Sequence, residues 1–382
     1  MTTLHDRVTS LAPALRARAR DAEQLRRIPA ESIRELTEAG LFRALTPKRH
    51  GGSELAVEPI YAALIEISRA CSATGWVAGL LAIHGFLLAR FDPRAQDEVW
   101  AAGPDVLAAS GVAPSGESVR VDGGVRVTGR WSYASGVDHC TWAILNTHLR
   151  DERSPDMKPA SHFVLVPAAD YTIEDDWHVN GLRGTGSKSI HLAGVFVPEH
   201  RVELGLAIQA GKARGLAGQS ALYQIAFPAL FPLVFTPPAI GTALAMIDHF
   251  RELNASRRAA YTGAAFATRP ATWARLASAT ANVDAARLLL ARDLAALVHE
   301  PAPLVTERAR HDVAFIVELC RRAVDELYAG SGGRALFEAS ALGRCFRDMH
   351  AITQHAATSL DDAAERYGQF LLTTGRTRET SP

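Results

Sequence analysis

The sequence predicts an α+β protein in which an N-terminal α-helical domain, a middle β-domain and a C-terminal helical bundle follow one another. Changes in the spacing of apolar residues support this order. The spacing is helical up to about residue 100, alternates with a period of two from about residue 106 to 204, and is helical again after residue 219. We place the domains at 1–105, 106–218 and 219–382. A chain of 382 residues with 48% hydrophobic content can bury a core in more than one such unit.

The N-terminal domain is predicted from apolar residues that recur every three to five positions between Ile28 and Leu45, with Gly40 where a helix would end. The most apolar run, 73–91, approaches the length of a membrane span. It contains three glycines, His84 and Arg90, and no polybasic flank follows it. We therefore interpret it as a buried helix and expect no membrane association.

The middle domain is predicted as a β-barrel-like unit of short strands. Residues 119–127 form two alternating segments around an Asp-Gly-Gly turn, and 141–146, 163–167 and 190–198 are further strand candidates. Between the last two lies 177–187, a cluster of glycines and hydroxyls. A phosphate-binding loop would lead into a helix N-terminus, so this cluster better suits the edge of a planar ring. A glycine-rich turn without a ligand is the competing interpretation.

The C-terminal domain is predicted to be a four-helix bundle. Ala-, Leu- and Arg-rich stretches at 237–260, 270–298, 304–330 and 340–372 have helical spacing and sufficient length. These helices have more apolar surface than one bundle usually buries, so we expect a homotetramer built as a dimer of dimers.

Composition excludes several functions. Lys plus Arg and Asp plus Glu both number 41, so no net charge is available to attract nucleic acid. Four scattered cysteines and no apolar signal core indicate reduced thiols and a cytoplasmic location. We expect no metal site, because His350 and His355 are five residues apart and no H-E-x-x-H motif is present.

Five stretches together resemble the acyl-CoA dehydrogenase superfamily, and within it the two-component, flavin-dependent monooxygenases that include hydroxylases of a phenolic secosteroid. The stretches are Cys71–Trp76, Phe91–Trp100, Tyr133–His139, Gly181–Ser187 and Phe346–His350. The resemblance covers almost the whole chain. It implies that reduced flavin, FMNH2 in preference to FADH2, reacts with O2 to give a C4a-hydroperoxide that hydroxylates a phenolic or polycyclic aromatic substrate.

The dehydrogenase branch needs a carboxylate base, and this sequence has no Asp or Glu at the positions where the dehydrogenases carry that base. Alignment on Arg347-Asp348 places Ala356 at the glutamate position, and 227–245 contains no Asp or Glu. An acyl-CoA dehydrogenase with a relocated base remains an alternative. So do an amino-sugar N-oxygenase on the same fold and a catalytically silent flavin-fold binding module.

The resemblance also implies the site residues. Ser135 would lie beside flavin N5, with His355 across the substrate as acid/base group and His84 approaching the same region. Five residues would contact the flavin ring: Trp177, Arg183, Thr185, Gly186 and Ser187. Arg258 would lie near the flavin phosphate, across a subunit interface. Tyr133 and Trp142 are candidates for the substrate cavity. No pyridine-nucleotide site is recognisable, so a separate NAD(P)H:flavin reductase is expected.

Overall fold

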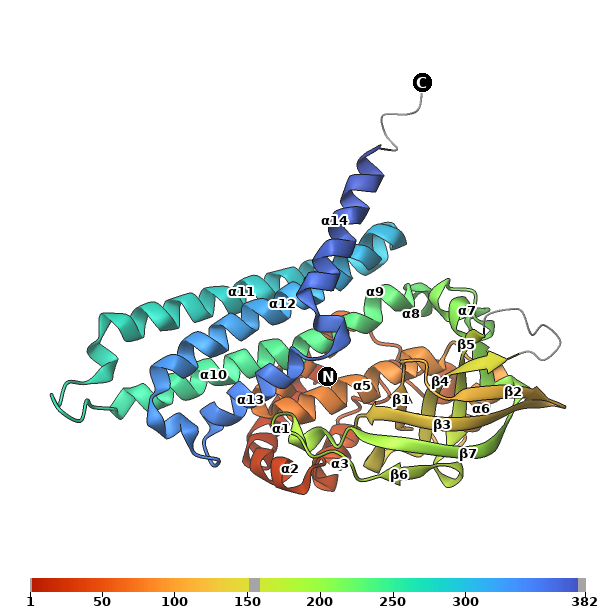
Figure 1. The fold of residues 1–382 in the computed structure, drawn as a ribbon, viewed down its shortest axis with the longest axis horizontal. Helices are drawn as coiled ribbons and strands as arrows, with labels where there is room; N and C mark the ends of the chain where they lie inside the picture. The colour runs from red at the N-terminus through yellow and green to blue at the C-terminus, as the bar shows by residue number, and fades with distance from the viewer. Residues whose placement is uncertain (1, 151–158, 377–382) are drawn as a thin grey trace.

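The computed structural model describes residues 2–150 and 159–376. Residues 1, 151–158 and 377–382 of the three predicted domains lie outside the described residues. A helical N-terminal part lies beside a β-sheet, and the long C-terminal helices pack against that helical part and extend away from the sheet (Figure 1). The order helices, sheet, helices confirms the predicted fold class.

The N-terminal part consists of six helices around an apolar centre. They are α1 Leu4–Ala17, α2 Ala19–Leu25, α3 Ala30–Glu38, α4 Val57–Ala70, α5 Ser72–Leu88 and α6 Pro93–Val99. Every residue of α5 is buried, because this helix packs against α4, the long helix α10 and strand β1. The apolar run is therefore a core helix, as predicted. Gly40 follows α3 with a φ of 83°, the left-handed conformation that glycine adopts without steric cost.

The middle part is one mixed sheet of eight strands. They are β1 Ala108–Gly111, β2 Glu117–Val121, β3 Gly124–Ala134, β4 Trp142–Arg150, β5 Ala160–Pro167, β6 Thr172–Glu174, β7 Lys188–Pro198 and β8 Val202–Leu204. Their order is β6-β7-β3-β2-β4-β5-β8, with β1 paired to β4. The predicted hairpin is present as β2 and β3. The barrel-like description needs correction, because the sheet is open: the terminal strands β6 and β8 do not pair within the described ranges.

The C-terminal part begins with short helical turns and continues as a bundle. The short elements are α7 Gly205–Gln209, α8 Ala221–Gln224, α9 Phe227–Leu230 and the 3-10 turn η7 Phe231–Phe235. The long helices are α10 Thr236–Ser256, α11 Pro270–His299 and α12 Ala302–Ser331, followed by α13 Ala341–Ile352 and α14 Leu360–Arg376. Helices α10 to α13 form the bundle, and α14 projects from it (Figure 1).

The predicted continuous helix over 340–372 is wrong. It is interrupted between α13 and α14, where Ala356–Thr358 forms a 3-10 turn, η10, and His355 caps that turn. Thr358 Oγ1 donates to the carbonyls of Ile352 and His355 at 3.0 and 2.7 Å. A side chain that binds the carbonyl of Ile352, the last residue of α13, competes with continued helix at this point.

One helical stretch, Phe227–Ser256, is long and apolar enough by composition to cross a membrane, but 89% of its most apolar window is buried inside the protein. This burial is what the core helix of a bundle shows.

Candidate active site

Three buried hydroxyls form a continuous hydrogen-bonded chain where β3, the 177–187 loop and α5 meet. Trp76 Nε1, on α5, donates to Ser135 Oγ at 3.1 Å. Ser135 Oγ lies 2.7 Å from Ser187 Oγ, which lies 2.7 Å from Thr185 Oγ1. Thr185 Oγ1 donates to the Leu182 carbonyl at 2.9 Å. The structure thus brings together Ser135, Thr185 and Ser187, three of the predicted site residues.

The glycines of the 177–187 loop have a packing role that the sequence did not reveal. A Cβ on Gly181 would stand 2.1 Å from the Arg347 carbonyl oxygen of α13, and one on Gly184 would stand 3.0 Å from the Ala22 backbone of α2. Gly186 has a φ of 52°, which favours glycine. The loop is therefore held between α2 and α13, and this close approach fixes the hydroxyl chain.

Asp348, on α13, also binds the 177–187 loop. Its Oδ1 accepts the backbone N–H of Leu182 at 2.7 Å, and the side chain is fully buried in α13. Burial raises the pKa of Asp348 to about 6, opposed by the Leu182 N–H and by Arg344. Because Leu182 has a φ of 51°, this bond holds a backbone conformation that leucine seldom adopts. Asp348 therefore positions the carbonyl at which the hydroxyl chain ends.

His84 lies on α5 with one ring nitrogen bonded and the other free. Nδ1 lies 2.6 Å from the Ala108 carbonyl oxygen, which can only accept, so Nδ1 carries the hydrogen. Nε2 is buried without a partner. Burial lowers the pKa of His84 to about 4, so the ring is neutral near pH 7 and Nε2 presents a lone pair.

His355 has the opposite arrangement. Its Nδ1 accepts the backbone N–H of Ala357 at 3.1 Å, so in the neutral ring the hydrogen lies on Nε2. Burial lowers the pKa of His355 to about 4 as well. One histidine therefore offers an acceptor and the other a donor, although the residue type is the same.

Aromatic side chains surround the two histidines. The ring centroids of His355 and Phe235 are 4.0 Å apart, and those of His84 and Phe231 are 6.3 Å apart. Trp76 contacts both Phe235 and His355, at 5.2 and 5.6 Å. Since Trp76 also binds Ser135, the histidines, the aromatic wall and the hydroxyl chain form one connected site.

A buried arginine anchors the segment that carries this wall. Arg90 donates to the carbonyls of Tyr223 and Ile225, at 3.2 and 2.7 Å, and to that of Phe86 at 2.7 Å. Its guanidinium carbon lies 3.8 Å from the centroid of the Phe86 ring. Arg90 thus fixes the chain just before α9 and η7.

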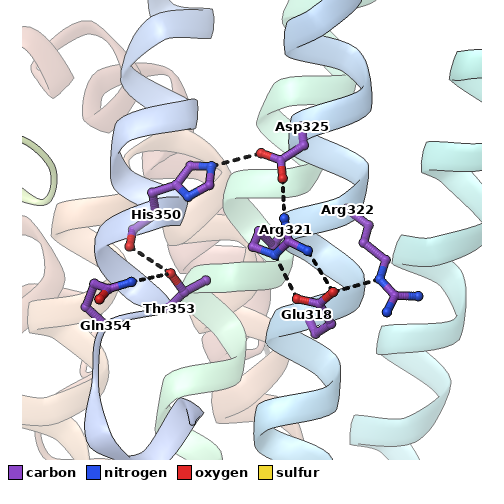
Figure 2. Close-up of polar contacts among 7 residues, drawn as sticks. All are labelled: Glu318, Arg321, Arg322, Asp325, His350, Thr353 and Gln354. Carbon is purple, nitrogen blue, oxygen red and sulfur yellow. Dashed lines mark hydrogen bonds and ion pairs between the residues drawn. The ribbon is translucent and has the colours of Figure 1, made fainter. Parts of the chain in front are cut away.

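His350 faces away from the site. Figure 2 shows it directed from α13 to Asp325 on α12, with Nε2 2.8 Å from Oδ1. Asp325 is paired with Arg321, whose Nε donates to Glu318 at 2.7 Å. Thr353 Oγ1 donates to the His350 carbonyl at 2.8 Å. This network ties the end of α13 to α12, directly before His355.

Trp177 and Arg183, which were predicted to bind flavin, lie beside the hydroxyl chain together with Tyr133, a candidate for the substrate cavity. Tyr133 is 73% exposed and has a φ of 67° within a β-bulge of β3, and its ring meets that of Trp177 edge-on at 6.1 Å. Trp177 Nε1 donates to the Leu182 carbonyl at 3.2 Å. Arg183 is exposed on the 3-10 turn Arg183–Thr185. Exposed aromatic surface beside buried hydroxyls fits a planar ring with polar edges.

The structure does not bring Trp142 and Arg258 to this cluster. The Trp142 ring faces the guanidinium of Arg201 at 5.1 Å, and Arg201 is paired with Glu98 of α6. Arg258 is exposed and follows the C-terminal end of α10 at Ser256. Within residues 2–150 and 159–376, no group of three or more His, Cys, Asp or Glu could hold a metal ion.

Known proteins share this architecture. Family models described as the N-terminal and C-terminal domains of acyl-CoA dehydrogenase match residues 4–102 and 233–360. The oxygenase subunit HsaA of a flavin-dependent monooxygenase from Rhodococcus jostii is 36% identical over 95% of this chain and 96% of its own length. The chain belongs to the acyl-CoA dehydrogenase family, in its flavin-dependent monooxygenase branch. It is therefore an enzyme of that type.

Further comparisons support reduced flavin as the cofactor. The oxygenase component of p-hydroxyphenylacetate 3-hydroxylase from Acinetobacter baumannii is 33% identical over 96% of this chain and 88% of its own. The structure of XiaF from Streptomyces, in complex with FADH2 and glycerol, superimposes with a TM-score of 0.88 at 30% identity and covers 97% of each chain. Oxygen is the expected co-substrate of this flavin.

Sequence reasoning missed several residues of the site. Trp76 and Asp348 lie inside the stretches that carry the resemblance, so those stretches held the available signal. Phe231 and Phe235 lie in a segment with prolines at 228 and 232, where only the folded chain shows which aromatic rings point to the histidines.

Proposed function

We propose that the chain is an oxygenase component that hydroxylates a small phenolic or polycyclic aromatic substrate. The observation that carries the proposal is the pair of neutral histidines, His84 buried and His355 half-buried, with opposite hydrogen-bonding character beside an aromatic wall. An aromatic ring suits Phe231, Phe235 and Trp76, whereas an amino sugar would need more polar partners.

His84 holds the substrate hydroxyl in this proposal. Its Nε2 lone pair has no partner in the protein, so a phenolic O–H satisfies a buried acceptor that otherwise costs free energy. A pKa of about 4 makes His84 a weak base. It therefore orients the hydroxyl and polarises the ring through a hydrogen bond.

His355 donates from Nε2 to the oxygen that accumulates negative charge during transfer. This divides the two roles differently from the sequence expectation, which assigned the acid/base role to His355. The dry, aromatic surroundings strengthen such a hydrogen bond.

Reduced flavin supplies the activation of O2. Ser135 would lie at N5, and Tyr133, Trp177, Arg183, Thr185, Gly186 and Ser187 at the ring. We propose a cytoplasmic homotetramer in which Arg258 reaches the flavin phosphate of a neighbouring subunit. Exposed apolar residues on α11 and α14 support assembly: Leu288, Val298, Leu371 and Leu372. A separate NAD(P)H:flavin reductase would deliver the reduced flavin.

Matched ligands test the proposal. In the methyl ether of a phenol a methyl group replaces the hydroxyl hydrogen, so the ether cannot donate a hydrogen bond. Binding to the protein with reduced FMN under anaerobic conditions should therefore favour the phenol by roughly tenfold, the equivalent of one hydrogen bond to a buried acceptor. His84→Leu should remove this preference. His162→Leu is the matched control, because His162 Nδ1 also contacts a backbone carbonyl, that of Ala160 at 3.0 Å, but lies on β5. Equal binding of phenol and ether to the wild type would contradict the role of His84.

A further inference from the structure

We propose that the hydroxyl chain of Ser135, Ser187 and Thr185 makes the site prefer reduced over oxidised flavin through the direction in which its protons point. The proposal rests on the proposed function, which places flavin N5 at Ser135. Reduced flavin carries a hydrogen on N5 and needs an acceptor there. Oxidised flavin has a lone pair on N5 and needs a donor.

In the first proton order, every hydroxyl points towards Leu182. Ser135 donates to Ser187, Ser187 donates to Thr185, and Thr185 donates to the Leu182 carbonyl. Ser135 also receives the Trp76 N–H, so one of its lone pairs remains free. In this order the chain can only accept from N5–H.

In the second order, the protons point the other way. Thr185 donates to Ser187, Ser187 donates to Ser135, and Ser135 now receives two hydrogens and directs its own towards the ligand. The Thr185 hydroxyl then no longer donates to the Leu182 carbonyl. That carbonyl still accepts hydrogen bonds from Trp177 Nε1 and from the backbone N–H of Thr185. In this order the chain can only donate to N5.

The two orders differ by one hydrogen bond inside the protein. The bond from Thr185 Oγ1 to Leu182 exists only in the order that accepts from N5–H, whereas Trp76 donates to Ser135 in both. Because the hydroxyls are buried, water does not replace the lost bond. One net hydrogen bond corresponds to a preference for reduced flavin of roughly five- to tenfold.

Two substitutions remove the bias by different routes. Thr185→Val leaves the Ser187 proton without an acceptor at residue 185, so Ser187 turns towards Ser135. Ser187→Ala removes the acceptor of the Ser135 proton, which then points to the ligand. Both variants should lower the ratio of oxidised-FMN to reduced-FMN dissociation constants by roughly five- to tenfold.

Thr147→Val is the matched control. Thr147 lies on β4, is fully buried, and its hydroxyl has no partner within the described residues. Its removal deletes the same atom type from the same sheet without touching the chain, so the ratio should stay unchanged.

The measurement is an anaerobic titration of each full-length protein with reduced FMN and with oxidised FMN, followed by flavin fluorescence. A tenfold fall in the ratio equals a fall of about 30 mV in the two-electron potential of bound flavin. A lower ratio in both variants but not in Thr147→Val supports the proposal. An unchanged ratio in either variant overturns it. If the wild type binds neither form, the proposed function itself fails, and this outcome is distinct from an unchanged ratio.

Discussion

Replacing Asp348 with asparagine should stabilise the protein above pH 6 and leave its stability near pH 4 unchanged. The carboxyl is buried and has a pKa of about 6, against an ordinary value of 3.8. Since the folded-state pKa is raised, its stabilising contribution is full below about pH 4 and is lost as the pH rises through 6. The difference corresponds to about 3 kcal/mol at neutral pH.

Asparagine keeps an oxygen for the Leu182 N–H, which Asp348 binds at 2.7 Å, but has no charge to bury. Asp348→Ala removes that acceptor as well and should be less stable than Asp348→Asn by about 1–3 kcal/mol at every pH, since neither variant titrates at this position. Asp122→Asn, an exposed change in the β2–β3 turn, controls for net charge.

The assay is denaturant unfolding of the three variants and the wild type at intervals between about pH 4 and 8, where linkage requires the curves to diverge. The free energy of unfolding of the Asn variant should rise progressively relative to that of the wild type as the pH increases, and the difference should level off above pH 6. A constant difference across this range would refute the reasoning, because it would mean that no proton is taken up at Asp348 on folding.

Three further results are expected from the site. His355→Ala should lower product formation by roughly 10²–10⁴-fold while O2 uptake continues as hydrogen peroxide release; unchanged coupling of oxygen uptake to hydroxylation would remove the residue from the mechanism. Ser135→Ala should keep the affinity for reduced FMN within about tenfold of the wild type but accelerate peroxide release in stopped-flow experiments, since one hydrogen bond among several is lost. Light scattering should show a tetramer. Arg258→Ala should weaken flavin binding without dissociating the tetramer, and a stable monomer in the wild type would exclude an intersubunit role for Arg258.

The fold could be predicted where local pattern and tertiary structure agree. Alternation and an Asp-Gly-Gly turn predicted the β2–β3 hairpin, and the apolar run predicted the buried helix α5. The interruption around His355 could not be predicted, because helical composition continues through it and the side-chain hydrogen bonds of Thr358 that accompany it form only in the folded chain. The open sheet likewise depends on which edges pair, and periodicity does not encode this.

The site was predictable only in part, for a related reason. Ser135, Thr185 and Ser187 lie in stretches that resemble known proteins, but Trp76 joins them across 59 residues of chain. The tautomers of His84 and His355 depend on the backbone groups of Ala108 and Ala357, which no sequence motif specifies. The loop glycines resembled a ligand contact, whereas the structure also requires them for the approach of α2 and α13.

The most direct test of the central claim follows the fate of oxygen. The protein is loaded anaerobically with reduced FMN and a panel of phenols and then mixed with ¹⁸O₂, and the label is measured in the aromatic product and in hydrogen peroxide. The account predicts that one or more phenols acquire a single labelled oxygen and that His84→Leu diverts the label to peroxide. Recovery of all label as peroxide with every phenol, from a protein whose bound oxidised FAD is reduced by acyl-CoA, would contradict it.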